Sequence, residues 1–205
     1  MWDDPFGLVF IGGDLEPDSL LEAYRRGIFP WFNEDDPLLW WSPDPRAIFE
    51  IDAVHVSRRL QRIIRQQRFT VTINQDFPQV MHACSQREEG TWITSDMFAA
   101  YCKLHELGFA HSVEAWDHGV LAGGIYGVAL GGFFAAESMF HSVSNAGMVA
   151  FAALVDRLRE RGFHMFDTQI ATDHTRQLGA IDIPRTAYLQ RLESALNVRT
   201  RFDDR

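Results

Sequence analysis

The sequence has only two cysteines, a single lysine and no long apolar run. Cys84 and Cys102 do not follow the spacing of a metal site or a redox motif, so we expect buried or idle thiols in a reducing compartment. The most apolar stretch, around residues 147–155, is far too short to span a bilayer, and the N-terminus is acidic where a signal peptide would be basic. These absences predict a cytoplasmic protein without a membrane partner.

Two further absences limit the ligands that the chain is expected to bind. It has no glycine-rich phosphate loop of either common type, and His141 has no second or third ligand at a spacing suited to a metal. We therefore expect no metal. The net charge of −9 argues against a general nucleic-acid binder, whose affinity comes from neutralising phosphates.

Positive charge is nevertheless concentrated in one short segment. Five arginines lie within residues 58–68, and helical spacing places Arg58, Arg62 and Arg65 on one face. This face is either a solvated helix surface or a strip that contacts phosphates, since arginine suits phosphate geometry. In the first interpretation the apolar residues turned inward are Leu60, Ile63 and Ile64.

The length of 205 residues and a hydrophobic fraction of 46% predict a folded protein with one large domain or two unequal ones. From residue 69 onward, antiparallel strands are followed by a helix, a strand and a helix, which predicts an α+β fold. The chain divides best near Arg46, into a small N-terminal domain of residues 1–46 and a larger domain of residues 47–205. The expected strands are 47–51, 69–73, 110–116, 120–128, 132–139 and 163–168, and the expected helices include 18–26, 76–83, 94–107, 147–161, 174–178 and 186–196.

A segment rich in tryptophan and proline stands before this division. Three of the six tryptophans, Trp31, Trp40 and Trp41, lie close together among prolines that favour a stiff, extended chain. Such a segment is either an aromatic platform that holds a flat ligand or a small aromatic core beneath a loop.

Two acidic residues lie in otherwise apolar strands. Glu137 lies within residues 133–140 and Asp167 within residues 163–169. Burying a carboxylate is costly unless it is paired or functional. Because side chains alternate along a strand, Asp167 and Gln169 share one face. These residues predict a site that binds and deprotonates a cationic amine; the alternative is that both acids lie at strand edges and face solvent.

Short motifs occur in a fixed order along nearly the whole chain. They include Gly12-Gly13-Asp14-Leu15, residues 24–32, residues 40–46, Thr91-Trp92-Ile93-Thr94, His111-Ser112-Val113-Glu114, Glu137-Ser138-Met139-Phe140 and Asp167-Thr168-Gln169. Together they resemble the leucyl/phenylalanyl-tRNA–protein transferases. Each motif alone is weak, whereas the ordered set is specific.

The resemblance implies an enzyme that takes leucine or phenylalanine, with methionine as a further candidate, from its aminoacyl-tRNA. The amino acid is joined to a protein whose N-terminal residue is arginine or lysine, which marks that protein for degradation by the N-end rule. The family also implies a small N-terminal domain, an acetyltransferase-like (GNAT) domain, a monomer and no cofactor. Because only the 3′ end of the tRNA need touch the protein, Arg58, Arg62 and Arg65 become candidates for contacting its phosphates.

The same resemblance implies binding roles for particular side chains. Trp31, Tyr24 and Tyr101 match the aromatic set that holds the terminal adenosine, where stacking contributes about 1–3 kcal/mol per base. The apolar pocket for the transferred side chain maps onto Ile125, Phe134, Phe151, Leu158 and Phe166.

Three residues match the catalytic region of the family. Asp167 and Gln169 correspond to its catalytic positions, and Glu137 to a nearby acid. Asp167 is expected to draw in and polarise the acceptor ammonium, while Gln169 orients the amine with its carbonyl. Because the aminoacyl ester is already reactive, much of the catalysis is expected to be positioning.

The chain departs from the family pattern in two places. His141-Ser142 stands where Ser-Arg is usual, and Gly147-Met148 stands where Ser-Lys is usual. Two cations are therefore missing near an expected anion-binding helix end. Two other functions stay open: an acetyltransferase that uses acetyl-CoA, and a non-catalytic module that binds a tRNA end or a protein N-terminus.

Overall fold

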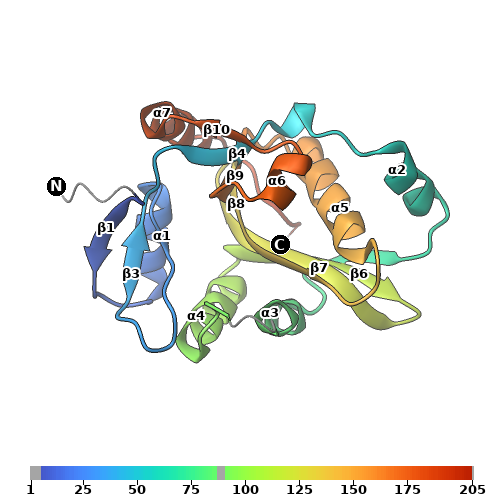
Figure 1. Cartoon of the computed structure of the whole chain (residues 1–205), viewed down its shortest axis with the longest axis horizontal. Coiled ribbons are helices and arrows are strands. Elements are labelled where there is room, and N and C mark those ends of the chain that lie inside the picture. The colour runs from blue at the N-terminus through green and yellow to red at the C-terminus, as the bar shows by residue number, and fades with distance from the viewer. Residues whose placement is uncertain (1–5, 87–90, 205) are drawn as a thin grey trace.

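The computed structural model describes residues 6–86 and 91–204, and the N-terminal part of the chain forms a small antiparallel sheet (Figure 1). Helix α1 (Pro17–Arg25) lies beside this sheet. It has a proline in its first turn, where the backbone N–H would have no partner within the helix. The tryptophan and proline segment is extended, as predicted, because parts of it pair within this sheet. The strand order is β1 (Leu8–Ile11), β3 (Leu39–Trp41) and β2 (Phe29–Pro30).

A seven-stranded mixed sheet forms the centre of the molecule. Strands β8 and β9 are parallel, and all other neighbours in this sheet are antiparallel. Together with the helices that cover it, the sheet confirms the predicted α+β class. The strand order is β10 (Ile181–Ile183), β4 (Arg46–Phe49), β9 (Met165–Gln169), β8 (Phe133–His141), β7 (Val120–Leu130), β6 (Ala110–Asp117) and β5 (Thr70–Ile73).

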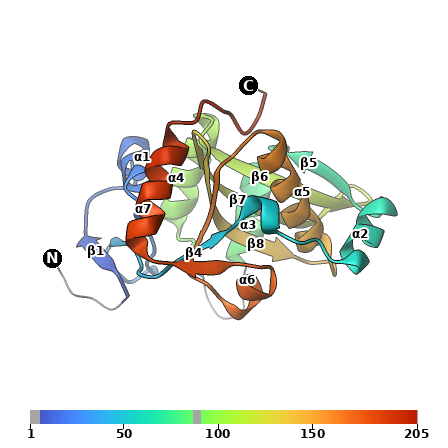
Figure 2. The ribbon, with the colours of Figure 1, turned by 90° about the horizontal axis from the view of Figure 1, so that it is seen from above.

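Helices cover both faces of the central sheet (Figure 1, Figure 2). Helices α3 (Phe77–Ser85) and α4 (Ser95–Glu106) pack on one face, and α5 (Ala146–Glu160) packs against β6, β7 and β8 on the other. Within the described ranges, no helix has the length and apolar character needed to cross a membrane. The other helical segments are the short η1 (Ile51–Ala53), α2 (Arg58–Arg65), α6 (Asp173–Gln177) and α7 (Arg185–Leu196).

Each face of the sheet has its own hydrophobic core. Phe77, Tyr101 and Tyr126 are fully buried beneath α3 and α4. Phe134 and Phe166 are fully buried in the second core, beneath α5. The two cores approach each other at β8 and β9, so side chains there can be positioned from both sides.

Several strands were not predicted because they are too short to show an alternating pattern. Strand β2 has 2 residues, and β3 and β10 have 3 each. The strand expected over residues 47–51 ends at Phe49, because Ile51–Ala53 form a 3₁₀ helix.

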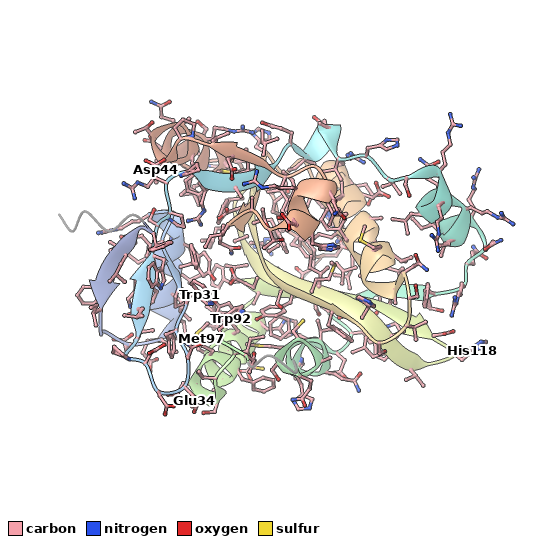
Figure 3. The ribbon with its side chains drawn as sticks, viewed as in Figure 1. Trp31, Glu34, Asp44, Trp92, Met97 and His118 are labelled. Atoms are coloured by element: carbon pink, nitrogen blue, oxygen red, sulfur yellow. The ribbon has the colours of Figure 1, made fainter. Side chains whose placement is uncertain are left out.

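A domain boundary after Arg46 stays a prediction. Arg46 is the first residue of β4, and the residues just before it contact α7. The Arg185 Nη1 group donates to the carbonyl oxygen of Ser42 at 2.6 Å, and the Arg185 backbone N–H donates to Asp44 Oδ1 at 3.0 Å. Asp44 is labelled in Figure 3, where the chain passes from the small sheet to the central one.

The C-terminal segment is anchored in the second core by one aromatic ring. Phe202 is 2% exposed, and its ring stacks on His111 and Phe134 with centroid distances of 4.7 and 5.2 Å. Arg157 Nε donates to the carbonyl oxygen of Phe202 at 2.7 Å. The segment therefore contributes to the core that supports the candidate site.

Candidate active site

A cavity of about 480 Å³ lies where the N-terminal sheet meets β8, β9 and α6. Its volume lies in the range of small-molecule sites, roughly 300–1,000 Å³. One part of its wall is apolar and another part is polar. The apolar residues include Phe49, Ile125, Met139, Phe151 and Phe166, and the polar ones include Glu137, Ser138, Thr168 and Gln169.

Two tryptophans contribute rings to this wall, and only one of them was predicted. Trp31 is 45% exposed and lines the cavity, as does Trp92. Figure 3 shows both between the small sheet and α4. Trp41 supports Trp31: its Nε1–H donates to the Trp31 carbonyl oxygen at 2.7 Å, and the rings meet edge to face at 6.1 Å. Trp92 lies in the Thr91-Trp92-Ile93-Thr94 motif. The motif marks this segment as part of the family pattern, but it does not indicate that the Trp92 ring faces a ligand.

Tyr24 and Tyr101 do not offer their rings to a ligand, contrary to the prediction that they stack on an adenosine. They are 1% and 0% exposed, enclosed by the first core. Their hydroxyl oxygens lie 2.5 Å apart, and the Tyr24 hydroxyl donates to Glu137 Oε1 at 2.7 Å. Burial raises the pKa of both phenols well above 10, so both stay protonated. Their contribution is a hydroxyl pair behind Glu137.

Gln169 and Glu137 are joined at the polar part of the cavity. The Gln169 side-chain Nε2 donates to Glu137 Oε1 at 2.9 Å, which orients the amide. The amide oxygen then has no hydrogen-bond partner among the residues that the structure describes. Because Gln169 lines the cavity, this oxygen is a candidate acceptor for an incoming N–H group.

Asp167 is buried behind Gln169 and does not line the cavity. The side chain of Arg46 donates to both carboxylate oxygens, from Nε to Oδ1 at 3.0 Å and from Nη2 to Oδ2 at 2.6 Å. Tyr188 Oη–H donates to Oδ2 at 3.0 Å, and the Gln169 backbone N–H donates to Oδ1 at 2.9 Å. The prediction that Asp167 contacts and polarises an ammonium group is therefore wrong for this arrangement, because its oxygens are already occupied. The alternative of a solvent-facing strand edge is also wrong, since Asp167 is 0% exposed.

The carboxyl group of Glu137 holds its proton more strongly than an ordinary glutamate. Burial raises its pKa from 4.5 to about 8. The hydrogen bond from Tyr24 lowers the pKa, the negative charge of Asp167 raises it, and Arg46 and Gln169 lower it, without offsetting the burial. At neutral pH the carboxyl of the free protein is therefore mostly protonated.

The predicted apolar pocket is divided between the cavity wall and the core behind it. Ile125, Phe151 and Phe166 line the cavity. Phe134 and Leu158 belong to the same second core as Phe166 but do not line the cavity, contrary to the prediction. The ring of Phe134 meets Phe166 edge to face at 6.0 Å and so supports the wall from behind.

The predicted arginine strip is exposed on α2, away from the cavity wall. Arg58, Arg62 and Arg65 are exposed, and in the described part of the chain none of them pairs with a carboxylate. Leu60 is buried, but Ile64 is 40% exposed rather than turned inward, because α2 packs on one side only. Ser57 caps this helix, accepting from the Leu60 N–H at 3.3 Å.

Comparison with known proteins bears on this site. A family model described as leucyl/phenylalanyl-tRNA protein transferase matches residues 48–193, and the model of that family's N-terminal domain matches residues 13–44. A leucyl/phenylalanyl-tRNA–protein transferase of Syntrophotalea carbinolica is 52% identical over 196 residues, which are 94% of this chain and 85% of the relative. One of Pseudomonas fluorescens is 51% identical over 197 residues, 95% of this chain and 87% of the relative.

Similarity to solved structures is more distant. A GCN5-related N-acetyltransferase-like protein from Streptococcus suis superposes with a TM-score of 0.38 and 12% identity, covering 81% of this chain and 63% of that chain. At this distance the likeness adds no argument about function.

The raised pKa of Glu137 predicts that stability falls as the pH rises. Between about pH 4.5 and 8 the folded protein holds a proton that the unfolded chain has lost, so this stabilisation is complete below pH 4.5 and is lost as the pH rises through about 8. Glutamine has the shape of the protonated carboxyl and does not titrate. We expect the free energy of unfolding of the wild type, relative to Glu137→Gln, to fall by up to about 1.4 kcal/mol per pH unit across this range.

Urea unfolding at a series of pH values measures this difference. Glu193→Gln, at an exposed position of α7, is the matched control and should give a profile parallel to the wild type. Parallel profiles for the wild type and Glu137→Gln would contradict the prediction.

Proposed function

Because the chain belongs to the leucyl/phenylalanyl-tRNA protein transferase family, we propose that it transfers leucine or phenylalanine from an aminoacyl-tRNA to the N-terminus of a protein. The observation that carries the proposal is one cavity in which tryptophan rings, an apolar wall and the Glu137–Gln169 pair meet. Each part of this cavity suits one part of the two substrates.

The aromatic wall suits the terminal adenosine of the tRNA. The exposed face of Trp31 and the neighbouring Trp92 line the cavity, and stacking on such rings is favourable for any base. Trp41 holds Trp31 in place through its Nε1–H, so the surface is largely formed before a ligand arrives. We assign the binding of the adenosine to these two rings, with Tyr24 and Tyr101 acting only through their hydroxyl groups.

The apolar wall suits the side chain of the transferred amino acid. Ile125, Phe151 and Phe166 contribute to a surface without a charged group, which favours leucine and phenylalanine over polar side chains. An apolar pocket discriminates by only about 1–3 kcal/mol per methylene, so methionine stays a candidate. Phe134 and Leu158 influence this selection indirectly, by supporting the wall.

The polar part of the cavity suits the amine of the acceptor protein. In the reaction a nitrogen–carbon bond forms, the ester bond to the ribose breaks, and the ribose oxygen takes a proton. Starting from an ammonium group, one further proton is released overall. The Gln169 amide oxygen accepts a hydrogen bond from the amine and aims it at the ester, because Glu137 fixes the orientation of the amide.

We assign the first proton to Glu137 in its ionised form, the minor form at neutral pH, which becomes more populated as the pH rises toward 8. Its pKa of about 8 matches that of an α-ammonium group, which is roughly 7.7–8.0, so proton transfer between them is nearly balanced. Asp167, the other predicted catalytic acid, lies behind Gln169 and accepts a hydrogen bond from the Gln169 backbone N–H.

Several parts of the proposal are supported by the family resemblance alone. They are an acceptor that begins with arginine or lysine, the marking of that acceptor for degradation, a monomeric enzyme and a cytoplasmic location. The arginine strip supports a contact with tRNA phosphates, since Arg58, Arg62 and Arg65 are exposed and arginine suits phosphate geometry. A local concentration of positive charge on this strip lets an acidic chain bind one end of a tRNA.

A transfer assay tests the proposed function. With labelled leucyl- or phenylalanyl-tRNA, the purified protein should add the label to a peptide that begins with arginine or lysine. Gln169→Ala should lower kcat about 100-fold, because the amine is no longer oriented. Gln190→Ala, at an exposed position of α7, should leave kcat unchanged. Acetyl transfer from acetyl-CoA in place of aminoacyl transfer, or binding without turnover, would overturn the proposal.

Tryptophan substitutions test the adenosine site. Trp31→Ala and Trp92→Ala should each weaken binding of aminoacyl-tRNA by about 1–3 kcal/mol, or roughly 5- to 150-fold, because a stacking face is lost. Trp116→Ala is the control, since Trp116 donates to Thr72 Oγ1 at 2.7 Å on β5 and does not line the cavity. Filter binding measures the affinities, and equal losses in all three variants would argue against a stacking role.

The salt dependence of tRNA binding tests the arginine strip. Replacing Arg58, Arg62 and Arg65 by glutamine should reduce the slope of log affinity against log salt by about 2–3 units, since up to three phosphate contacts are lost. A variant with Arg25→Gln and Arg26→Gln, which removes two exposed arginines on or beside α1, should keep the wild-type slope. An unchanged slope in the triple variant would show that α2 does not contact the tRNA.

A further inference from the structure

Arg46 is a fully buried cation that the proposed reaction does not use. It is 1% exposed, and its guanidinium carbon lies 4.8 Å from the ring centroid of Phe29 and 4.6 Å from that of Tyr188. Its Nη1 donates to the carbonyl oxygen of Gly27 at 3.1 Å. Arg46 does not line the cavity, so it does not contact substrate directly.

The other hydrogen bonds of Arg46 go to Asp167, which in turn binds Gln169. The guanidinium binds the Asp167 carboxylate with two parallel hydrogen bonds, which fix the plane of that carboxylate as a single contact would not. Asp167 Oδ1 also accepts the backbone N–H of Gln169 at 2.9 Å. Arg46 and the Gln169 main chain are therefore bound to the same oxygen atom.

Gln169 needs such a restraint because its backbone is in an unfavourable conformation. Its φ is +57°, in the left-handed region that residues other than glycine rarely adopt. The side chain leaves this backbone toward Glu137, where Nε2 donates at 2.9 Å. If the backbone relaxed to negative φ, the side-chain amide would leave the place where it meets the acceptor amine.

We propose that Arg46 is a positioning residue for the transfer reaction, which acts through Asp167 to hold the Gln169 backbone and thereby its side-chain amide. The inference rests on the proposed function, since it assigns a task to Gln169 in that reaction. It also gives Asp167 a role that its burial permits, because a carboxylate with four donors can hold its neighbours without touching the substrate.

A purely structural role for the ion pair is the competing explanation. Replacing a buried ion pair by apolar residues of similar volume often leaves stability unchanged, whereas removing one partner leaves an uncompensated charge. The double variant Arg46→Met with Asp167→Leu therefore removes both charges while keeping a filled core. The double variant Arg46→Met with Asp167→Asn is also uncharged but keeps an oxygen that can accept the Gln169 N–H.

The two double variants differ in the one hydrogen bond that the proposal requires. We expect Arg46→Met/Asp167→Leu to lower kcat by about 100-fold, as an orientation effect does, with KM for aminoacyl-tRNA within about twofold of the wild type. We expect kcat of Arg46→Met/Asp167→Asn to be at least tenfold higher than kcat of Arg46→Met/Asp167→Leu. Arg46→Lys keeps the positive charge but cannot form two parallel hydrogen bonds to the carboxylate. Its kcat should lie between those of the wild type and the leucine variant.

Hydrogen exchange of the Gln169 backbone amide provides a readout that does not depend on activity. This amide should exchange at least tenfold faster in the leucine variant than in the asparagine variant. Arg68→Met is the control, because it breaks an ion pair with Asp117 of β6, near the opposite edge of the central sheet from β4, and should change neither kcat nor this exchange rate.

The outcomes separate the inference from the proposed function. A wild type that transfers no amino acid refutes the proposed function, while the exchange rates still decide whether Arg46 and Asp167 hold Gln169. Wild-type kcat in the leucine variant, or an equal exchange rate in both double variants, overturns the positioning role. A rise in KM at unchanged kcat overturns it as well, because the pair would then serve substrate binding.

Discussion

The buried ion pair between Arg46 and Asp167 connects the separate parts of the chain around the candidate site. Arg46 also binds the carbonyl of Gly27 at the end of α1, and Tyr188 of α7 donates to the same carboxylate. Asp167 in turn holds the backbone N–H of Gln169. A charge pair removed from water is tolerated when its hydrogen-bonding positions are filled, and four segments fill them here. The geometry of the site therefore depends on how the two ends of the chain pack together.

The wall of the cavity has three chemically different parts. Tryptophan rings provide flat apolar faces, the wall that includes Phe151 and Phe166 excludes charge, and Glu137 with Gln169 provides the hydrogen-bonding groups. The same burial that makes the wall apolar raises the pKa of Glu137 toward that of an amine. The raised pKa of Glu137 and the apolar character of the wall beside it thus reflect the same enclosed environment.

Sequence reasoning predicted the chemical groups of this site better than their environments. Glu137 and Gln169 both line the cavity, and Trp31 presents an exposed face. The expectation that Tyr24 stacks on a ligand was wrong. A tyrosine in a sequence motif does not indicate whether its ring or only its hydroxyl group is used. Trp92 received no role, since nothing local indicates that it lies near Trp31.

By itself, the sequence determined the α+β class, most of the helices and longer strands, and the family, because periodicity, helix caps and the order of motifs are local properties of the chain. Only the tertiary structure decided which of the marked side chains reach the cavity. Tyr24 and Glu137 are 113 residues apart in the chain, and Arg46 and Asp167 are 121 apart. Burial and partner choice arise from such distant contacts, so the pKa of Glu137 and the enclosure of Asp167 follow from packing and not from any local pattern.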